Sequence, residues 1–243
     1  MMIFDNGFLE VLGTEDYLLE EKFHSKKNDV YKVRCLKVLE GQKVAVIKKY
    51  LQPSINIKRE IDLLLHLREK GLSVPEIYFK ENEYIIMEYI EGKTLLEVME
   101  ERERNNLFRK GYPYQSNEHL ICTLIEWLER FYHHTNGKLI LTDINLRNFI
   151  INNNGVVYGF DFEDCDAGRI EEDAAKLCAY ILTYDPSFSS WKLQFTREVF
   201  YLLLKKFHLN DEVLLKEVEK EITNINRKRR KCFAIELFSN TIK

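Results

Sequence analysis

Short apolar segments alternate with polar turns through the first part of the chain. Residues 18–23, 30–36 and 43–50 are rich in Val, Ile, Leu and Tyr, which favour β-strands. Polar residues separate these segments, and Glu40-Gly41 has the composition of a turn. The pattern predicts three strands that pair antiparallel in a meander.

The spacing of the apolar residues becomes helical after Pro53. Ser54 can cap the start of a helix, and Gly71 can end it. The apolar positions between them lie at helical spacing: Ile57, Ile61, Leu64, Leu65 and Leu67. Residues 76–80 and 84–90 then have strand composition again. Five strands with one helix after the third predict an α+β lobe.

Helices dominate the pattern from Gly92 onward. Thr94 and Glu97 have the spacing of a capping box, in which each side chain accepts a hydrogen bond from the other residue's backbone N–H group. The polar segment 102–113 predicts a loop. A stripe of Leu, Ile and Phe then predicts a helix over residues 116–135.

The rest of the chain predicts one hairpin followed by helices. Residues 149–151 and 156–160 flank an Asn-Gly turn, which is typical of a β-hairpin. Residues 171–228 are mostly helical in pattern. The change of pattern near Glu91 predicts two domains, 1–91 and 92–243, of which the second is mainly helical.

Composition and charge narrow the class of protein. The chain has 243 residues, of which 45% are hydrophobic and 31% charged, so collagen-like, low-complexity and wholly disordered proteins are excluded. The net charge of -3 predicts neither nucleic acid nor a membrane surface as a partner. The five cysteines are scattered and the N-terminus is acidic rather than basic, which favours a reducing, cytoplasmic location.

The first chemical signal combines a strand lysine with a helix carboxylate. Lys48 lies on the third predicted strand and Glu60 on the helix that follows. A lysine held in this way presents its ammonium group to the α- and β-phosphates of a nucleotide. The alternatives are a solvated lysine without function, or Lys49 on the opposite face of the strand.

Two acidic segments follow in the second domain. Asp143 in ILTDINLRNFI is followed by Asn148, the spacing at which an acid accepts a hydroxyl proton and an amide binds a metal in phosphoryl-transfer enzymes. Asp161 ends an apolar strand, where an acid can bind Mg²⁺ beside the β- and γ-phosphates. Each segment alone is also consistent with a polar turn. Their order and spacing together indicate phosphoryl transfer.

With these residues the chain resembles the protein-kinase-like superfamily, and within it the aminoglycoside phosphotransferase and choline kinase branch. The resemblance implies a two-lobed protein-kinase-like fold with the nucleotide in the cleft between the lobes. It implies that Lys48 and Glu60 form the phosphate-binding pair. Met87-Glu88-Tyr89-Ile90 is similar to the hinge, where the Glu88 carbonyl and the Ile90 N–H group would bind adenine.

The same resemblance implies the catalytic roles. Asp143 corresponds to the catalytic base, and Asn148 and Asp161 correspond to ligands of Mg²⁺. The phosphoryl donor is expected to be ATP or GTP. Asp173 in EEDAAKL resembles the structural aspartate that opens a helix in the second lobe.

Several parts of the sequence depart from the family pattern, among them Glu163 in place of the glycine of the D-F-G motif. Residues 24–29 contain no glycine where a glycine-rich loop is usual, and Ser25 or Lys26 would approach the phosphates there instead. Leu141 replaces a histidine of the catalytic loop and would act as a packing substitute. Asn145 replaces a lysine near the γ-phosphate, and Arg147 would compensate for the lost charge.

The phosphoryl acceptor is predicted from the segment after Asp161. That segment is short and carries no A-P-E signature, which favours a small hydroxylated acceptor such as an amino sugar or a choline-like alcohol. Six acids within residues 163–173 would attract a cation, or would simply be solvated. The alternatives are a small atypical Ser/Thr protein kinase, a pseudokinase and a nucleotidyltransferase. The basic run 227–231 is interpreted as a solvated face, and the oligomeric state is not predicted.

Overall fold

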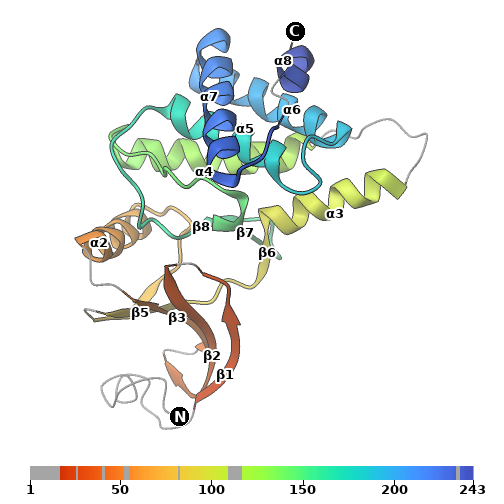
Figure 1. Ribbon diagram of the computed structural model, residues 1–243. Helices are drawn as coiled ribbons and strands as arrows, with labels where there is room; N and C mark the ends of the chain where they lie inside the picture. Colours follow the sequence, from red (N-terminus) through yellow and green to blue (C-terminus); the bar gives the residue numbers. More distant parts are fainter. Residues whose placement is uncertain are drawn as a thin grey trace. The chain divides into compact units, whose positions relative to one another are not determined.

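The computed structural model of this chain describes residues 17–25, 27–39, 42–51, 55–81, 83–108, 117–233 and 236–242. Its contacts divide the chain into two compact units, Met1–Glu91 and Gly92–Lys243. Figure 1 shows a sheet-rich first unit and a second unit built mainly of helices. The α+β class predicted from the sequence is therefore confirmed.

The N-terminal unit is an antiparallel sheet with one helix. Its five strands have the order β1-β2-β3-β5-β4, and helix α2 lies between the third and fourth strands in the sequence. The elements are β1 (Tyr17–Phe23), β2 (Asn28–Leu39), β3 (Gln42–Tyr50), α2 (Ile55–Glu69), β4 (Ile77–Lys80) and β5 (Tyr84–Glu88). The predicted turn at Glu40-Gly41 and the predicted cap at Ser54 lie outside the described residues.

Helix α2 ends at the predicted glycine. Gly71 has a φ of 77°, a left-handed conformation that costs glycine little because it has no Cβ. The N–H group of Gly71 donates to the carbonyl of Arg68 at 2.9 Å, and that of Leu72 donates to Leu67 at 3.0 Å. These two bonds are the Schellman motif that satisfies the last carbonyls of a helix. Leu65, predicted in the apolar stripe, is instead 40% exposed.

The C-terminal unit begins with a small sheet of order β6-β7-β8. The predicted hairpin is present as β7 (Phe149–Asn152) and β8 (Val157–Gly159). The third strand, β6 (Gly92–Thr94), was not predicted; it pairs with β7. A Cβ at Gly92 would lie 2.3 Å from the carbonyl oxygen of Ile151, so glycine permits this close pairing.

The capping box predicted at Thr94 starts helix α3 (Leu95–Phe108). The Thr94 N–H group donates to Glu97 Oε2 at 2.7 Å, and the Glu97 N–H group donates to Thr94 Oγ1 at 3.2 Å. The predicted loop over 102–113 is wrong as far as residue 108, because α3 continues through that segment. Glu103 makes a buried ion pair with Lys192 at 2.7 Å, which holds a polar sequence in helical form.

Helices make up the rest of the C-terminal unit. They are α4 (Glu118–His134), α5 (Ile170–Thr183), α6 (Ser190–Phe207), α7 (Asp211–Arg229) and α8 (Glu236–Ile242). Helix α5 packs against α6 and α7, while α4 and α8 pack against α6 (Figure 1). The predicted helix over 116–135 and the helical content of 171–228 are confirmed. None of the helices in the described part of the chain is long and apolar enough to cross a membrane.

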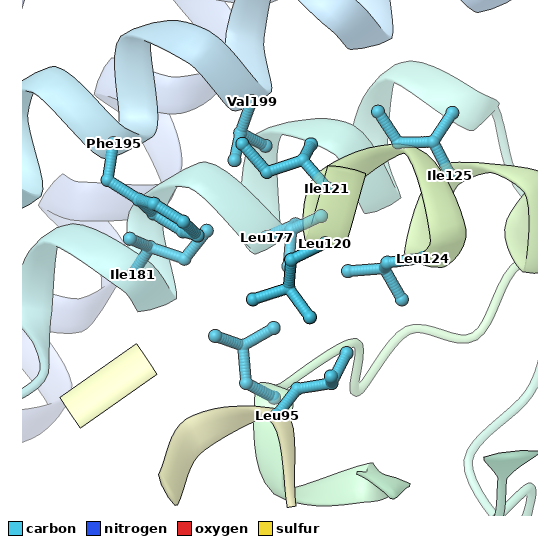
Figure 2. A pocket seen from close by; sticks show the side chains of 10 residues that line it. Leu95, Leu120, Ile121, Leu124, Ile125, Leu177, Ile181, Phe195 and Val199 are labelled. Carbon is cyan, nitrogen blue, oxygen red and sulfur yellow. The ribbon is translucent and has the colours of Figure 1, made fainter. Parts of the chain in front are cut away.

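A small cavity of about 20 Å³ lies within this helical core. Figure 2 shows the side chains that surround it, which come mainly from α4, α5 and α6. The lining is entirely apolar: Leu95, Leu120, Ile121, Leu124, Ile125, Leu146, Leu177, Ile181, Phe195 and Val199. A cavity of this size without polar partners does not hold an ordered water, so it is a packing gap rather than a ligand site.

Candidate active site

Lys48 and Glu60 form a buried ion pair in the N-terminal unit. Lys48 on β3 and Glu60 on α2 are only 4% and 1% exposed. Lys48 Nζ lies 2.9 Å from Glu60 Oε1 and 2.8 Å from Oε2, and the Tyr50 hydroxyl donates to Oε2 at 2.8 Å. Strong hydrogen bonds of this kind offset the cost of burying both charges. The pairing predicted from the sequence is present.

The pleat of β3 separates Lys48 from Lys49. Successive residues of a strand point to opposite faces, and Lys49 is half-buried rather than buried. Lys48 pairs across the sheet with Val30 and Ile85, which places it in the middle of the sheet. The geometry therefore favours Lys48 over Lys49 as the lysine held by Glu60.

The predicted phosphate loop contains an exposed serine. Ser25 Oγ accepts a hydrogen bond from the Asn28 N–H group at 3.3 Å, and Asn28 itself is buried. The serine hydroxyl thus organises the loop and retains its own proton as a donor. Lys26 lies outside the described residues. Contact of Ser25 with phosphate stays a prediction.

The predicted hinge begins at the end of β5. Met87 and Ile90 are buried. The Glu88 carboxylate accepts from the Glu76 N–H group at 3.2 Å and lies 3.5 Å from Arg68 Nη1. The side chain of Glu88 is therefore used within the sheet-bearing unit. Only backbone groups of this segment are suited to adenine, as the resemblance implies.

A buried aspartate on α5 holds the loop that carries Asp143. Asp173 is fully buried, and its carboxylate accepts hydrogen bonds from the N–H groups of Leu141 at 2.7 Å and Thr142 at 3.0 Å. The Tyr132 hydroxyl donates to it at 3.0 Å. Burial raises the pKa of Asp173, and these three donors oppose the rise. Asp173 acts as the structural aspartate that the sequence indicated.

The backbone directly before Asp143 is strained. Thr142 has a φ of 57°, which is unfavourable for a β-branched residue. The Asp143 N–H group donates to the Leu141 carbonyl at 2.7 Å, so Thr142 is the central residue of a γ-turn. The Thr142 hydroxyl donates to the carbonyl of Asp164. Strain of this kind persists only where surrounding bonds impose it, and it is concentrated at functional sites.

Two side chains hold the carboxylate of Asp143. The Tyr180 hydroxyl lies 3.4 Å from Asp143 Oδ1. Asn148 Nδ2 donates to the Asp143 carbonyl at 2.9 Å and lies 3.5 Å from Oδ2. Burial and the charge of Asp143 raise the pKa of Tyr180, so its hydroxyl remains a donor. Because the amide nitrogen of Asn148 is used in this way, its oxygen is available as a metal ligand.

Asp161 lies between a strand and an aromatic cluster. It has a φ of 65° and follows β8. Phe162 is buried beside Trp127 and Phe131, with ring centres 6.2 Å and 6.1 Å from its own and nearly parallel ring planes. The Phe160 N–H group donates to the Asn148 carbonyl at 3.1 Å. The two predicted metal ligands are therefore anchored to the same short sheet.

The remaining predicted loop residues have clear local roles. The side chain of Leu141 is buried, as expected for a packing substitute. Asn145 Oδ1 accepts from the Arg147 N–H group at 2.9 Å. The Arg147 guanidinium lies over the ring of Tyr184, 5.4 Å from its centre, and the Tyr184 hydroxyl accepts from the Leu146 N–H group at 3.1 Å.

Sequence reasoning missed two tyrosines at the end of α5: Tyr180 lies within the helix and Tyr184 is its C-cap. Tyr180 and Tyr184 contact the catalytic loop from the helix that Asp173 opens. Tyr180 follows Asp173 by seven positions, and Tyr184 follows Tyr180 by four. These spacings place the three side chains on one face of a helix. This stripe of one acid and two tyrosines could have indicated that the helix supports the loop.

The family model described as the RIO domain matches residues 17–165, more than half of the chain, including both acidic segments and the Lys48–Glu60 pair. The chain belongs to the RIO domain family. RIO domains are atypical protein kinases of the protein-kinase-like superfamily. A comparison with curated proteins returns no match.

The match confirms the predicted superfamily and corrects the predicted branch. The branch is the RIO domain, not the aminoglycoside phosphotransferase and choline kinase branch. The short segment after Asp161 leaves no room for a long activation segment, but it does not identify the acceptor, and the predicted small-molecule acceptor is not shown. The matched residues end before α5–α8, the part of the chain that the family model leaves unassigned.

Proposed function

We propose that this RIO domain transfers the γ-phosphoryl group of ATP to a serine or threonine hydroxyl of a protein. The observation that carries the proposal is the carboxylate of Asp143, held by Tyr180 and Asn148 on a loop that Asp173 fixes. A positioned carboxylate that accepts the hydroxyl proton is what phosphoryl transfer to an alcohol needs. A protein acceptor is favoured over a small molecule because RIO domains are atypical protein kinases.

The other residues supply binding and charge neutralisation. Lys48 binds the α- and β-phosphates, and Glu60 fixes the ammonium group. Asn148 and Asp161 provide oxygen ligands of the kind that Mg²⁺ prefers. When bound, Mg²⁺ neutralises charge on the β- and γ-phosphates. Backbone groups of Glu88 and Ile90 bind adenine, and Ser25 donates to phosphate.

The residues of the catalytic loop act by positioning rather than by covalent chemistry. Asp143 orients the acceptor hydroxyl and takes its proton, while Tyr180 and Asn148 hold the carboxylate in place. Orientation and preorganised charge account for most of the acceleration in reactions of this class. Arg147 has the predicted role of compensating for the missing lysine at Asn145.

The test measures transfer of labelled γ-phosphate from ATP with Mg²⁺ by the wild-type chain and by Asp143→Asn. Transfer to Ser or Thr of the chain itself or of added unphosphorylated proteins is expected, and Asp143→Asn should lower it by about 10²–10⁴-fold. Nucleotide affinity, measured by calorimetry, should be unchanged in that variant. Asp62→Asn, at an exposed acid on helix α2, is the matched control and should keep full activity.

Three results would contradict the proposal. Label on amino sugars or choline-like alcohols rather than on protein would restore the small-molecule kinase. Binding of ATP without any transfer would identify a pseudokinase. Transfer of the nucleotide moiety instead of the γ-phosphate would identify a nucleotidyltransferase. Repeating the calorimetry with GTP tests which nucleotide is the phosphoryl donor. Measuring ATP binding by Asp161→Asn with and without Mg²⁺ tests Asp161 as a metal ligand.

A further inference from the structure

Five consecutive basic residues end helix α7. Arg227, Lys228 and Arg229 form its last turn, Arg230 is the C-cap in a left-handed conformation, and Lys231 follows. All five are exposed. Cations are stabilised at the C-terminal end of a helix by the helix dipole, but that effect is confined to the last turn. It does not explain why the run continues past the end of the helix.

This run lies beside the helix that supports the catalytic loop. Arg229 Nη1 donates to the Thr183 carbonyl, the last residue of α5, at 3.1 Å. The next residue is Tyr184, which bonds Leu146 through its hydroxyl and carries the guanidinium of Arg147 over its ring. Burial raises the pKa of Tyr184 to about 12, against the opposing charges of Arg147 and Arg229. Both guanidinium groups are therefore close to the same phenol.

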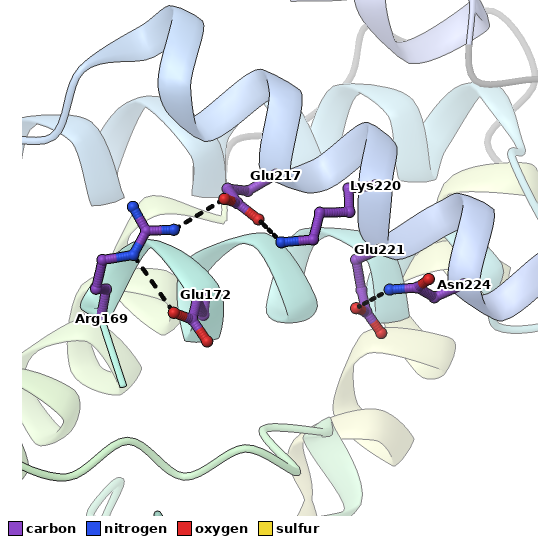
Figure 3. Close-up of polar contacts among 6 residues, drawn as sticks. All are labelled: Arg169, Glu172, Glu217, Lys220, Glu221 and Asn224. Atoms are coloured by element: carbon purple, nitrogen blue, oxygen red, sulfur yellow. Dashed lines mark hydrogen bonds and ion pairs between the residues drawn. The ribbon is translucent and has the colours of Figure 1, made fainter. Parts of the chain in front are cut away.

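The positive charge at this place is largely uncompensated. Among the described residues, no carboxylate forms an ion pair with Arg147 or with residues 227–230, and Lys231 lies 3.8 Å from Asp185. The other end of the α5–α7 pair differs. Figure 3 shows Arg169 bonded to Glu172 and Glu217, and Glu217 bonded to Lys220. Charges around the N-terminal end of α5 are thus paired with one another, whereas the basic run beside its C-terminal end has, among the described residues, only the Lys231–Asp185 ion pair.

We propose that Arg147 and residues 227–231 form an acceptor-docking surface for an acidic protein segment. The proposal rests on the proposed function, because it names the class of acceptor whose hydroxyl reaches Asp143. Carboxylates or phosphorylated side chains flanking that hydroxyl would pair with the guanidinium and ammonium groups. A peptide is favoured over nucleic acid for two reasons. The chain has a net charge of -3. The ring of Phe233, which lies beneath the Lys231 ammonium group, is stacked on Phe188 at 5.6 Å rather than open to a base.

The test measures peptide binding directly, in the absence of nucleotide. A fluorescent Ser-containing peptide with Glu at the flanking positions is compared with its Gln twin by anisotropy. The acidic peptide should bind at least about tenfold more tightly, and its affinity should fall between about 50 and 200 mM salt. Arg227→Glu/Lys228→Glu should remove the preference. Equal affinity for the two peptides would overturn the proposal.

Two further variants test whether a loss of peptide binding is due to the docking surface, to the change in net charge or to unfolding. Lys205→Glu/Lys216→Glu makes the same charge change at exposed positions on α6 and α7 and should leave peptide affinity unchanged. If it weakens binding equally, the specific surface is wrong. The Glu variant could unfold because negative charges are repelled by the C-terminal end of the helix dipole. Arg227→Gln/Lys228→Gln removes the positive charges without that repulsion, so it tests the surface in that case. A single-stranded oligonucleotide that displaces the acidic peptide at lower concentration would overturn the choice of a protein partner.

Transfer to the same peptides distinguishes failure of the docking surface from failure of the proposed function. Phosphorylation of both peptides at equal rates would support the kinase and reject the surface. Binding of the acidic peptide without phosphoryl transfer would support the surface and reject the kinase. Faster transfer to the acidic peptide, lost in Arg227→Glu/Lys228→Glu but kept in the control, would support both.

Discussion

Asp173 Oδ2, in the first turn of helix α5, lies 2.7 Å from the backbone nitrogen of Leu141. The other carboxylate oxygen accepts from Thr142, the strained residue before Asp143. One buried side chain therefore satisfies two backbone donors of the catalytic loop. The position of Asp143 depends on where α5 begins, and not only on the loop's own sequence.

Replacing Asp173 by Asn should destabilise the chain and abolish transfer. The amide would place a donor against one of the two backbone N–H groups, leaving a buried donor without an acceptor, which costs about 1–3 kcal/mol. Urea unfolding should show this loss in the free energy of unfolding. Glu171→Gln makes the same charge change in the same turn of α5 and should cost less than about 1 kcal/mol. Equal losses in the two variants would contradict the role of Asp173.

The buried pair of Lys48 and Glu60 should show strong coupling. Lys48→Met leaves the Glu60 carboxylate buried without its cation, which costs about 3–5 kcal/mol. The double variant Lys48→Met/Glu60→Gln should lose much less than the sum of the single variants, because both charges are removed. A double-mutant cycle by chemical denaturation measures this coupling. Lys49→Met is the control, with an expected change within about 0.5 kcal/mol.

Gly159 should not tolerate a methyl group. A Cβ there would lie 2.3 Å from Trp127 Cζ2, inside the aromatic cluster that anchors Phe162. Gly159→Ala should therefore lower the free energy of unfolding by about 1–3 kcal/mol. Trp127→Phe in the same chain should recover part of that loss by making room. No recovery would contradict the contact with Trp127 as the reason for the glycine, because Gly159 is not among the residues with a positive φ.

The stability of the chain at high pH should depend on Tyr184. Its pKa is about 12 in the folded chain and 10.0 as a free side chain, so the folded state keeps a proton that the unfolded state loses. The unfolding free energy should therefore fall as pH rises from 10 to 12, by up to about 2–3 kcal/mol for this group. Tyr184→Phe should remove that part of the decline, whereas Tyr201→Phe, at an exposed tyrosine, should not. Equal slopes in the two variants would contradict the assignment.

Local patterns were sufficient for most of the fold. The strands around Lys48, the helix ended by Gly71 and the capping box at Thr94 follow from periodicity and from turn chemistry, because each is decided by residues close in sequence. The strand at Gly92 could not be predicted in this way. Its partner β7 lies far along the chain, and its three residues carry no alternation of their own.

The site residues also divide into those that nearby sequence predicts and those that depend on distant parts of the chain. The candidate residues Lys48, Asp143 and Asn148 were found by spacing, and the structure gives each a bonded partner. The supporting tyrosines Tyr180 and Tyr184 were not found, because their contacts are long-range. The acceptor could not be predicted either, because no local motif in α5–α8 indicates which surfaces meet.

The buried pair of Glu103 and Lys192 has a consequence for the order of synthesis. Glu103 lies on α3 and also accepts from the Ser189 hydroxyl, while Lys192 Nζ donates to the Pro186 carbonyl at 2.9 Å. Glu103 is therefore synthesised well before Lys192 emerges from the ribosome. Domains generally form as units from the N-terminal side during translation, but α3 cannot bury Glu103 until Lys192 has emerged. The C-terminal unit therefore acquires its native core only late in its own synthesis, after α6 has begun to appear.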